Sequence, residues 1–307
     1  MNIKTSALSR VEKKFANGIF LDEDTQRCFD ENGYAVIPFY NKDQIKEFNL
    51  LYDLIQPKNV RGIFPSTYSK DKSYRDSAHQ EICTIAQSSQ DRTFKNYKII
   101  CGSFIVKYPG SENTMDVHQD MTLVDEKHFS GINIWVPLID LNDNNGTLYI
   151  LEGSHQLLHT YRGASIRPIY DKSVVSRAIR KLARPVYPKA GEAIVFDQSI
   201  IHFSEQNQSD VPRIVTNIFI TQKEASILTA WHEPSMGSFV ELFEHNSEFM
   251  QLFEQFSEDI NLRPRMGKSV GRVPYAFPRI NYHLLKRHYP GCIDRLSVLD
   301  RIRLSLL

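Results

Sequence analysis

The stretch MDVHQDMTLV places a histidine and an aspartate two positions apart among apolar residues. In an extended strand, side chains at i and i+2 leave the same face, so His118 and Asp120 would point together with Gln119 opposite. Another histidine, His202, ends a later apolar run, and Arg213 begins the next one. Two imidazoles and a carboxylate from separate strands suit a facial metal site, which leaves half of an octahedral Fe(II) open for a chelating cosubstrate and O₂.

The elements that must position these residues are short β-rich runs between about 98 and 222. Gly, Asn, Asp and Pro turns separate the runs, and one helical insertion at about 171 to 183 interrupts them. Strands at this spacing predict an antiparallel sandwich or barrel. The runs are KIICGSFIVKYP, GINIWVPLIDL, TLYILEGS, EAIVFDQSIIHF and RIVTNIFIT.

The segment before this β core predicts two helices with a strand between them. LDEDTQRCFDENGYAVIPFY has the pattern of a helix opened by acidic residues, an Asn-Gly turn and a strand from Tyr34 to Pro38. Asn41 can cap the second helix, which carries an apolar stripe. Residues 56 to 75 are rich in Pro, Gly, Ser and Lys and predict a surface loop, with another helix at 76 to 89.

The chain after residue 235 returns to a helical pattern. MGSFVELFEHNSEFMQLFEQF sets Phe, Leu and Met on one face and acids opposite, which predicts an amphipathic helix. Such a face packs on the core or mediates self-association, so a homodimer through the C-terminal region is a candidate assembly. Because no linker-like stretch separates the parts, we expect residues 1 to 307 to form one domain, with helical extensions around the β core.

Composition and charge place the chain among ordinary globular proteins. It has 307 residues, of which 41% are hydrophobic and 24% charged, and its formal net charge is +1. This balance gives no reason to expect nucleic-acid or membrane binding. Residues 261 to 307 nevertheless carry ten Lys or Arg against two Asp, and residues 162 to 189 carry eight against one. Such runs are usually solvated faces; the alternative is that they frame the mouth of a site for an anionic substrate.

Several other classes of protein find no support in the sequence. The four cysteines form no C-x-x-C pair, so they predict reduced thiols rather than a zinc knuckle or a disulfide framework. The first residues lack the apolar core of a signal peptide, and no apolar run is long enough to span a bilayer, so we expect a soluble, cytoplasmic protein. The motifs of serine hydrolases, P-loop NTPases and Rossmann dehydrogenases are absent. The cysteines are Cys28, Cys83, Cys101 and Cys292.

These motifs together resemble the phytanoyl-CoA dioxygenase family of Fe(II)/2-oxoglutarate-dependent oxygenases. The family pattern has H-x-D, a strand with W-x-P-L, a segment N-G-x-L ending in G-S-H, and a distal histidine followed eleven positions later by arginine. This chain has HQD, NIWVPLIDL and NNGTLYILEGSH, and His202 and Arg213 have the family spacing. Glu152 replaces the usual proline before G-S-H, which we expect to affect only the local turn.

The resemblance implies an α+β, mostly antiparallel protein with a double-stranded β-helix core, the jelly roll of cupin-like proteins, and flanking helices. It also implies that His118, Asp120 and His202 bind Fe(II). Arg213 would pair with the distal carboxylate of 2-oxoglutarate, because a guanidinium fork matches a carboxylate bidentately and keeps its charge.

Gln119 and Trp135 match family positions beside the cosubstrate, and each has a simpler rival interpretation. Trp135, taken alone, would be a core residue, and Gln119 would be structural unless the strand bends. Lys107 on the preceding strand would add positive charge. His155 and His159, at i and i+4, are an alternative zinc pair, but no glutamate lies between them as in H-E-x-x-H.

The activity implied by the family converts 2-oxoglutarate and O₂ to succinate and CO₂ while it oxidises a small molecule. Halogenating relatives carry a small residue at the carboxylate position, so Asp120 favours hydroxylation, desaturation or cyclisation. We expect a small, anionic metabolite or an intermediate of natural-product biosynthesis as substrate. The alternative is a non-catalytic scaffold that kept the fold and docks partners through its Phe-rich acidic helix.

Overall fold

The described strands pair in antiparallel fashion, and helices lie toward both ends of the chain. The computed structural model describes residues 18–57, 60–110, 114–158, 160–163, 165–166, 168–170, 174–246, 249–252, 267–293 and 296–305. The strands are β1 (Tyr34–Pro38), β2 (Ile63–Pro65), β3 (Tyr97–Lys107), β4 (Met115–His118), β5 (Ile132–Pro137), β6 (Leu148–Ile150), β7 (Arg184–Val186), β8 (Glu192–Asp197), β9 (His202–Ser204), β10 (Arg213–Gln222), β11 (Ile227–Trp231), β12 (Phe239–His245) and β13 (Lys268–Pro274). The α-helices are α1 (Glu23–Asn32), α2 (Lys42–Ile55), α3 (Lys72–Asp91), α4 (Val174–Leu182), α6 (Tyr282–His288), α7 (Pro290–Ile293) and α8 (Val298–Ser305).

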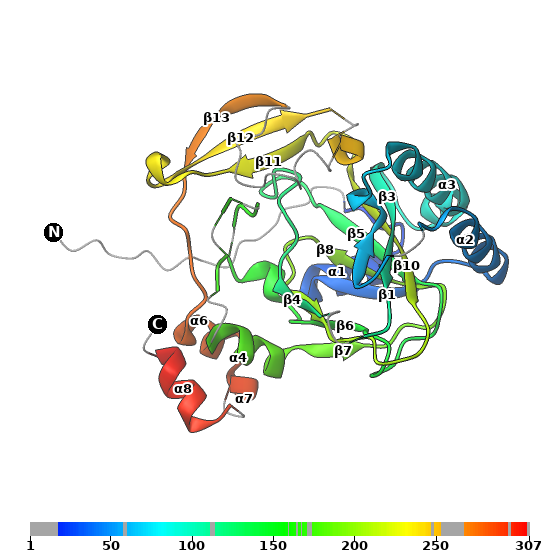
Figure 1. Cartoon of the computed structure of the whole chain (residues 1–307). Helices are drawn as coiled ribbons and strands as arrows, with labels where there is room; N and C mark the ends of the chain where they lie inside the picture. Colours follow the sequence, from blue (N-terminus) through cyan, green and yellow to red (C-terminus); the bar gives the residue numbers. More distant parts are fainter. Residues whose placement is uncertain are drawn as a thin grey trace.

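Strands β1 to β10 form the two sheets of a jelly roll (Figure 1). The larger sheet has the order β1-β8-β5-β10-β3-β2, and the smaller sheet has the order β4-β9-β6-β7. Side chains of both sheets share one apolar cluster, in which Trp135 and Phe196 of the larger sheet pack with Ile150 of the smaller. The predicted antiparallel double-stranded β-helix is therefore confirmed.

Alternation along β5 divides the larger sheet into two buried faces. Ile132, Ile134 and Val136 belong to the outer cluster, which they share with residues of α2 and α3. Asn133 and Trp135 leave the opposite face, toward the space between the sheets. Because both faces are covered, the strand is buried over its whole length and its sequence is apolar nearly throughout.

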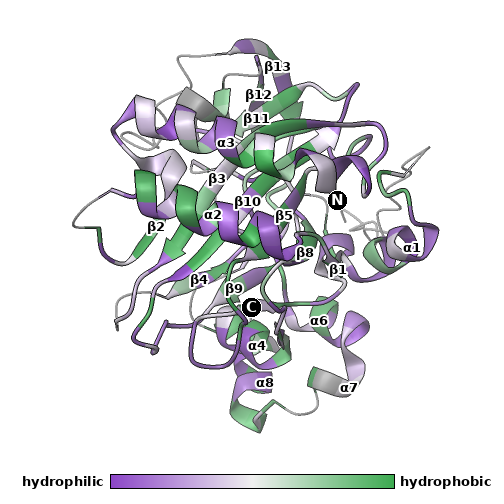
Figure 2. Cartoon of the chain, turned by 90° about the vertical axis from the view of Figure 1, so that its right-hand side faces the viewer, coloured by the Kyte–Doolittle hydropathy of each residue, from purple (hydrophilic) through white to green (hydrophobic). Residues whose placement is uncertain are grey.

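Helices α2 and α3 lie across the outer face of the larger sheet (Figure 2). The predicted cap of α2 is confirmed, because the side chain of Asn41 accepts from the backbone of Gln44 and the Gln44 side chain accepts from the backbone of Asn41. Phe48 of α2 and Ile82 of α3 are fully buried against the sheet. Residues of these helices pack against residues of β3 and β10 in one buried cluster, which fixes the position of the two strands.

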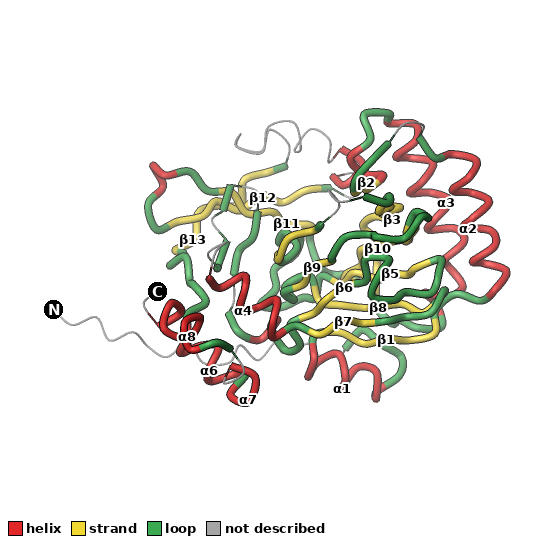
Figure 3. The backbone as a smooth tube through the Cα atoms, turned by 60° about the horizontal axis from the view of Figure 1, so that its bottom comes forward, coloured by secondary structure: helices red, strands yellow, loops and turns green. Residues whose placement is uncertain are grey.

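Helix α1 ends at the predicted turn and leads into an edge strand of the larger sheet. Gly33 has φ 81°, a conformation that favours glycine, and its N–H caps the helix at the Phe29 carbonyl. The chain then enters β1, which pairs with β8. Figure 3 shows α1 beside β1, with α4, α6 and α8 gathered together away from it. The predicted helix, turn and strand of this segment are confirmed.

The structure changes the prediction for two segments. The expected surface loop at 56 to 75 contains β2 and a short 3₁₀ helix, Ser66–Tyr68, and α3 begins at Lys72 rather than at residue 76. The helix expected after residue 235 is wrong over Phe239–His245, which form β12 between β11 and β13. Residues 247 to 248 and 253 to 256 of that prediction lie outside the described residues. A short apolar run fits either helix or strand, and here two neighbouring strands decided the outcome.

The C-terminal part therefore combines a three-stranded sheet with the helices α6, α7 and α8, instead of being helical throughout. The insertion expected at about 171 to 183 is helical over Val174–Leu182, while residues 171 to 173 lie outside the described residues. Among the described helices, none combines the length and the apolar character required to cross a bilayer.

Candidate metal and cosubstrate site

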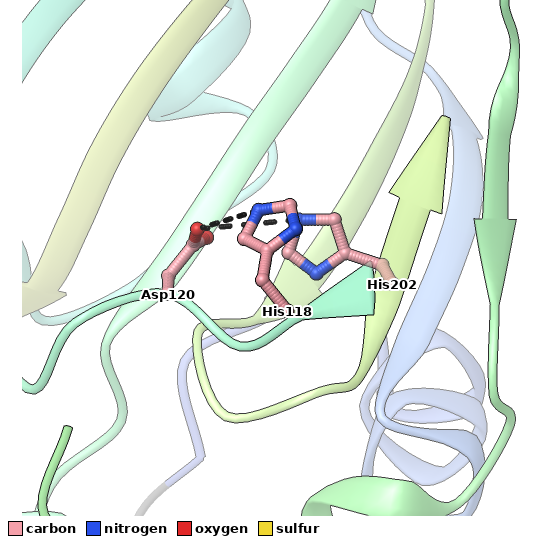
Figure 4. Close-up of side chains that lie close together, drawn as sticks. All are labelled: His118, Asp120 and His202. Carbon is pink, nitrogen blue, oxygen red and sulfur yellow. Dashed lines mark ion pairs between the residues drawn. The ribbon is translucent and has the colours of Figure 1, made fainter. Parts of the chain in front are cut away.

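Three of the residues predicted to do chemistry meet at one end of the smaller sheet. His118 ends β4, His202 begins β9, and the two residues are direct partners in the antiparallel register. Asp120 lies two residues beyond β4, and one potential ligand atom from each of the three residues lies within 4.8 Å of the others. The Asp120 Oδ1 is 3.6 Å from the Nε2 of His118 and 3.9 Å from the Nε2 of His202 (Figure 4).

Backbone carbonyls turn both imidazoles toward this point. The Nδ1 of His118 lies 2.8 Å from the carbonyl oxygen of Asp116, and the Nδ1 of His202 lies 3.1 Å from that of Ile200. A carbonyl oxygen only accepts, so each Nδ1 carries the proton and each Nε2 presents a lone pair beside Asp120. This is the tautomer that a metal-binding histidine requires.

Asp120 is held at three of its atoms. Its Oδ2 accepts from the Nδ2 of Asn133 at 2.7 Å, its carbonyl oxygen accepts from the Nε of Arg162 at 2.5 Å, and its N–H donates to Gln198 at 3.0 Å. Burial acts to raise the pKa of this carboxyl, but its interactions with His202, His118 and Arg162 outweigh burial and hold the pKa below its usual range. Asp120 is therefore ionised at neutral pH.

The pKa values of the two histidines shift in opposite directions. Burial, helped by the charge of His118, lowers the pKa of His202 to about 4, so this imidazole is neutral at pH 7. Burial also acts against the charged form of His118, but the hydrogen bond and charge of Asp120 prevail and raise the pKa of His118. An ionised carboxylate beside two imidazole Nε2 atoms is a donor set for a divalent cation.

A buried guanidinium lies at the start of β10. Arg213 is 2% exposed, and its Nη1 donates to the carbonyl oxygen of Gly146 at 2.5 Å. Its Nε is buried without a partner, and among the described residues no carboxylate forms a salt bridge with it. The guanidinium carbon lies 5.0 Å from the centre of the Trp135 ring. Burial lowers the pKa of Arg213 to about 9, which reflects a cation that lacks a counter-ion.

Lys107 lies beside this arginine, since the two residues are direct partners in the register of β3 and β10. Its ammonium donates to the Oγ of Ser204 at 2.6 Å and to the backbone carbonyl of Glu205. Burial and the charge of Arg213 lower the pKa of Lys107 to about 6, against a smaller opposing effect of Glu205. The Glu205 carboxylate itself binds Arg180 at 2.7 Å. A buried guanidinium and a buried amine, which can take up a proton when an anion binds, thus share one region of the fold.

The structure assigns different surroundings to the remaining predicted site residues. Trp135 and Lys107 both lie next to Arg213. Gln119 points elsewhere, because its Nε2 donates to the carbonyl oxygen of Ser199 at 2.5 Å. That bond ties the residue between His118 and Asp120 to the loop that precedes His202.

The alternative pair of histidines has a structural role at one position. His155 is buried in the 3₁₀ helix Ser154–Gln156, and its Nε2 lies 3.1 Å from the carbonyl oxygen of Asp30. His159 lies outside the described residues. Among the residues that the structure describes, His118, Asp120 and His202 are the one His, Cys, Asp or Glu group with a geometry suited to a metal.

Sequence reasoning missed the residues that support Asp120. Arg162 forms a buried, two-bonded salt bridge with Glu126, and the Oε1 of Glu126 also accepts from Gln198 at 2.7 Å. No local pattern marks such a pair, because its members come from different loops. Asn133 had a weak signal: it lies two positions before Trp135 on a strand and so shares its face.

Comparison with protein families gives the class of this chain. The family model described as "Phytanoyl-CoA dioxygenase (PhyH)" matches residues 29–215, more than half of the chain. The chain therefore belongs to the phytanoyl-CoA dioxygenase family, a family of Fe(II)/2-oxoglutarate-dependent oxygenases.

Curated relatives match over a shorter stretch. "Phytanoyl-CoA dioxygenase domain-containing protein 1" of Danio rerio is 28% identical over 140 residues, and "Phytanoyl-CoA dioxygenase 1" of Oryza sativa subsp. japonica is 26% identical over 133 residues. Each alignment covers 43% of this chain and 47% of the relative. The chain thus spans about half the length of the curated relatives it matches.

Solved structures give weaker similarities. The non-heme alpha ketoglutarate dependent carbocyclase SnoK from nogalamycin biosynthesis has a TM-score of 0.49 and 17% identity, covering 67% of this chain and 86% of its own. HygX from Streptomyces hygroscopicus, with nickel and 2-oxoglutarate bound, has a TM-score of 0.47 and 13% identity, covering 66% and 88%.

Proposed function

We propose that this protein is an Fe(II)/2-oxoglutarate-dependent dioxygenase that oxidises a small molecule. The observation that carries the proposal is the presence of a His-Asp-His group together with a buried arginine that has no acidic partner among the described residues. A metal site alone would suit many activities. A metal site together with an unpaired guanidinium in the same fold suits a cosubstrate that both chelates a metal and carries a second carboxylate.

His118, Asp120 and His202 would hold the iron. The fit is supported by the two Nε2 lone pairs, by the ionised carboxylate and by the two carbonyl bonds that fix the imidazole tautomers. Two imidazoles and one carboxylate are the ligand set of the facial non-heme iron site. When bound, such an iron supplies the O₂ chemistry that couples decarboxylation of 2-oxoglutarate, to succinate and CO₂, to oxidation of the substrate.

Arg213 would bind the distal carboxylate of 2-oxoglutarate, with Lys107 and Trp135 beside it. The Nε of the guanidinium is buried without a partner, so a carboxylate bound there would satisfy it and neutralise the cation. Lys107 would add a positive charge by taking up a proton when the anion binds, and the Trp135 ring lies against the guanidinium. These groups bind and orient the cosubstrate and leave the chemistry to the metal.

The outcome of the reaction is proposed from Asp120. A carboxylate at this position occupies the place where halogenating relatives admit chloride, which favours hydroxylation, desaturation or cyclisation. The anionic character of the substrate stays a prediction. Within the basic stretch 162 to 189, Arg162, Arg180 and Lys181 already pair with acidic residues of this chain, which weakens that stretch as a reason to expect an anionic substrate.

The organisation of the protein is also proposed rather than settled. We infer one catalytic domain and a cytoplasmic location from the sequence. The amphipathic helix first proposed as the dimer contact is not present over Phe239–His245. A homodimer through the C-terminal region is instead supported by the exposed apolar side chains of α8, Val298, Leu299 and Ile302. Light scattering on the purified chain, with Ile302→Glu as the dissociating variant, tests the assembly.

The alternative of a non-catalytic scaffold has lost its main support. Its docking face was the Phe-rich acidic helix, and Phe239–His245 of that segment form a strand in which Val240 and Phe243 are buried. The intact set of three metal-site residues and Arg213 has no use in a scaffold.

The deciding experiment measures succinate formed from 2-oxoglutarate with and without Fe(II). We expect iron-dependent succinate release from the wild-type protein and none from His118→Ala, Asp120→Ala or His202→Ala. Under anaerobic conditions, Fe(II) and 2-oxoglutarate should give the visible charge-transfer band of the chelate. A folded wild-type protein that shows neither the band nor iron-dependent succinate would rule out the proposed activity.

A further inference from the structure

Two asparagines on neighbouring strands form a chain of hydrogen bonds that ends on Asp120. The Nδ2 of Asn217 donates to the Oδ1 of Asn133 at 3.1 Å, and the Nδ2 of Asn133 donates to the Oδ2 of Asp120 at 2.7 Å. We propose that Asn133 is a positioning residue that presents a single oxygen of Asp120 to the metal, and that Asn217 fixes the direction of the Asn133 amide. The inference rests on the proposed function, because it concerns the same metal site.

The register of the larger sheet brings the two asparagines together. Asn133 of β5 is opposite Phe219 of β10, and Asn217 is opposite Trp135. Residues two positions apart along paired antiparallel strands are diagonal neighbours on one face, within reach of each other's side chains. Both asparagines therefore leave the inner face of the sheet, where Trp135 and the metal site also lie.

The direction of the amide follows from its two neighbours. An ionised carboxylate only accepts hydrogen bonds, so the group of Asn133 that faces Asp120 must be its NH₂. The Oδ1 of Asn133 then faces the NH₂ of Asn217, which supplies the matching donor. If the Asn133 amide were rotated by half a turn, its oxygen would face the carboxylate and two NH₂ groups would face each other. Asn217 thus disfavours the wrong orientation of Asn133.

The bond to Asn133 separates the roles of the two carboxylate oxygens. Oδ2 is occupied by the amide, whereas Oδ1 is the atom that lies 3.6 Å and 3.9 Å from the histidine Nε2 atoms. Asn133 is 6% exposed, so little water competes for its bond. A carboxylate held in this way offers one oxygen to a cation and keeps the second from taking another coordination position. The positions that a cosubstrate and O₂ require are then left open.

Metal affinity in the absence of cosubstrate tests this role. The full-length, metal-free protein is titrated with Co(II), and its visible absorption reports both binding and geometry. For Asn133→Leu, we expect Co(II) affinity to fall roughly 10- to 100-fold, the usual effect of losing a partner of a metal ligand. The Co(II) spectrum should also change, because a carboxylate released from Asn133 can turn both oxygens toward the metal.

Two further variants separate positioning from general stability. Asn217→Leu keeps the donor on Asn133 but removes the group that orients it, so we expect a smaller loss of affinity. Ser103→Ala is the matched control: Ser103 is opposite Asn217 on the same sheet, is 5% exposed and bonds only the Asn217 carbonyl oxygen, at 3.3 Å. Its Co(II) affinity should equal that of the wild-type protein, and thermal unfolding of each metal-free variant confirms folding.

Two results would overturn the positioning role of Asn133. Co(II) affinity of Asn133→Leu within about twofold of wild type, or an equal loss in Ser103→Ala, overturns the positioning role, since a lost partner is expected to matter far more. If Asn133→Leu does not fold, Asn133→Ala takes its place, because it removes the amide without adding volume. The same fold-changes in Co(II) affinity then decide the outcome. Failure of the proposed function looks different, because the wild-type protein would then bind no Co(II) or His118→Ala would bind it equally well.

Discussion

Replacement of Arg213 by methionine should remove most of the affinity for 2-oxoglutarate without harming the fold. In the structure the guanidinium donates from Nη1 to Gly146, and its Nε is buried without a partner. The edge formed by Nε and Nη2 therefore has the geometry for two parallel bonds to a carboxylate. Each charge-assisted hydrogen bond contributes about 1.5–3 kcal/mol, so two contribute about 3–6 kcal/mol. Because about 1.4 kcal/mol is a factor of ten, the dissociation constant should rise roughly 100- to 10,000-fold.

The assay compares two ligands that differ only at the distal end. Calorimetry on the Mn(II)-loaded, anaerobic protein measures the binding of 2-oxoglutarate and of 2-oxopentanoate, which keeps the keto acid but lacks the second carboxylate. We expect wild type to prefer 2-oxoglutarate strongly and Arg213→Met to bind both ligands with the same weak affinity, since each change removes the same interaction. Arg213→Lys should fall between them, because lysine supplies charge without the fork.

A matched stability measurement checks the reasoning in the absence of ligand. Arg213 is a buried cation without an acidic partner among the described residues, so methionine at this position should leave the unfolding temperature of the ligand-free protein unchanged or raise it. Should Arg213→Met retain the wild-type preference for 2-oxoglutarate over 2-oxopentanoate, the carboxylate does not bind at this guanidinium and the cosubstrate assignment is wrong.

Three other predictions follow from buried charges and from backbone strain. The folded-state pKa of Lys107, about 6, lies below its usual 10.5, so the contribution of this group to stability rises as pH increases through that interval. Binding of 2-oxoglutarate should raise this pKa. Calorimetry in two buffers should then detect proton uptake near pH 7.5, and Lys107→Met should abolish it. Loss of either partner of the Arg162–Glu126 salt bridge should lower the free energy of unfolding, measured by urea titration, by about 3–5 kcal/mol. The double variant Arg162→Met with Glu126→Leu should recover most of that loss. Additive losses would contradict a coupled pair. Gly33→Ala should lower thermal stability more than Gly153→Ala, because both have positive φ but only the Gly33 Cβ would lie 2.4 Å from a histidine nitrogen; equal effects would show that the contact relaxes freely.

The sequence by itself predicted the strands of the core, the first helices and the candidate site residues. Short β-rich runs separated by turn residues predicted the strands of the jelly roll, and the Asn41 cap and the Gly33 turn predicted helix boundaries, because these signals act between residues close in sequence. His118, Asp120, His202 and Arg213 were found from residue types and spacing, since the chemistry of a metal site restricts which side chains can serve it.

Only the tertiary structure decided how those groups are supported. Asn133 reaches Asp120 through the register of β5 and β10, and Arg162 meets Glu126 across two loops, so neither contact has a signature in local sequence. The segment Phe239–His245 has an apolar pattern that suits a helix, yet it forms a strand because β11 and β13 lie on either side to complete its hydrogen bonds. Long-range pairing of this kind depends on where the rest of the chain places its free edges and buried charges, and no short window of sequence contains that information.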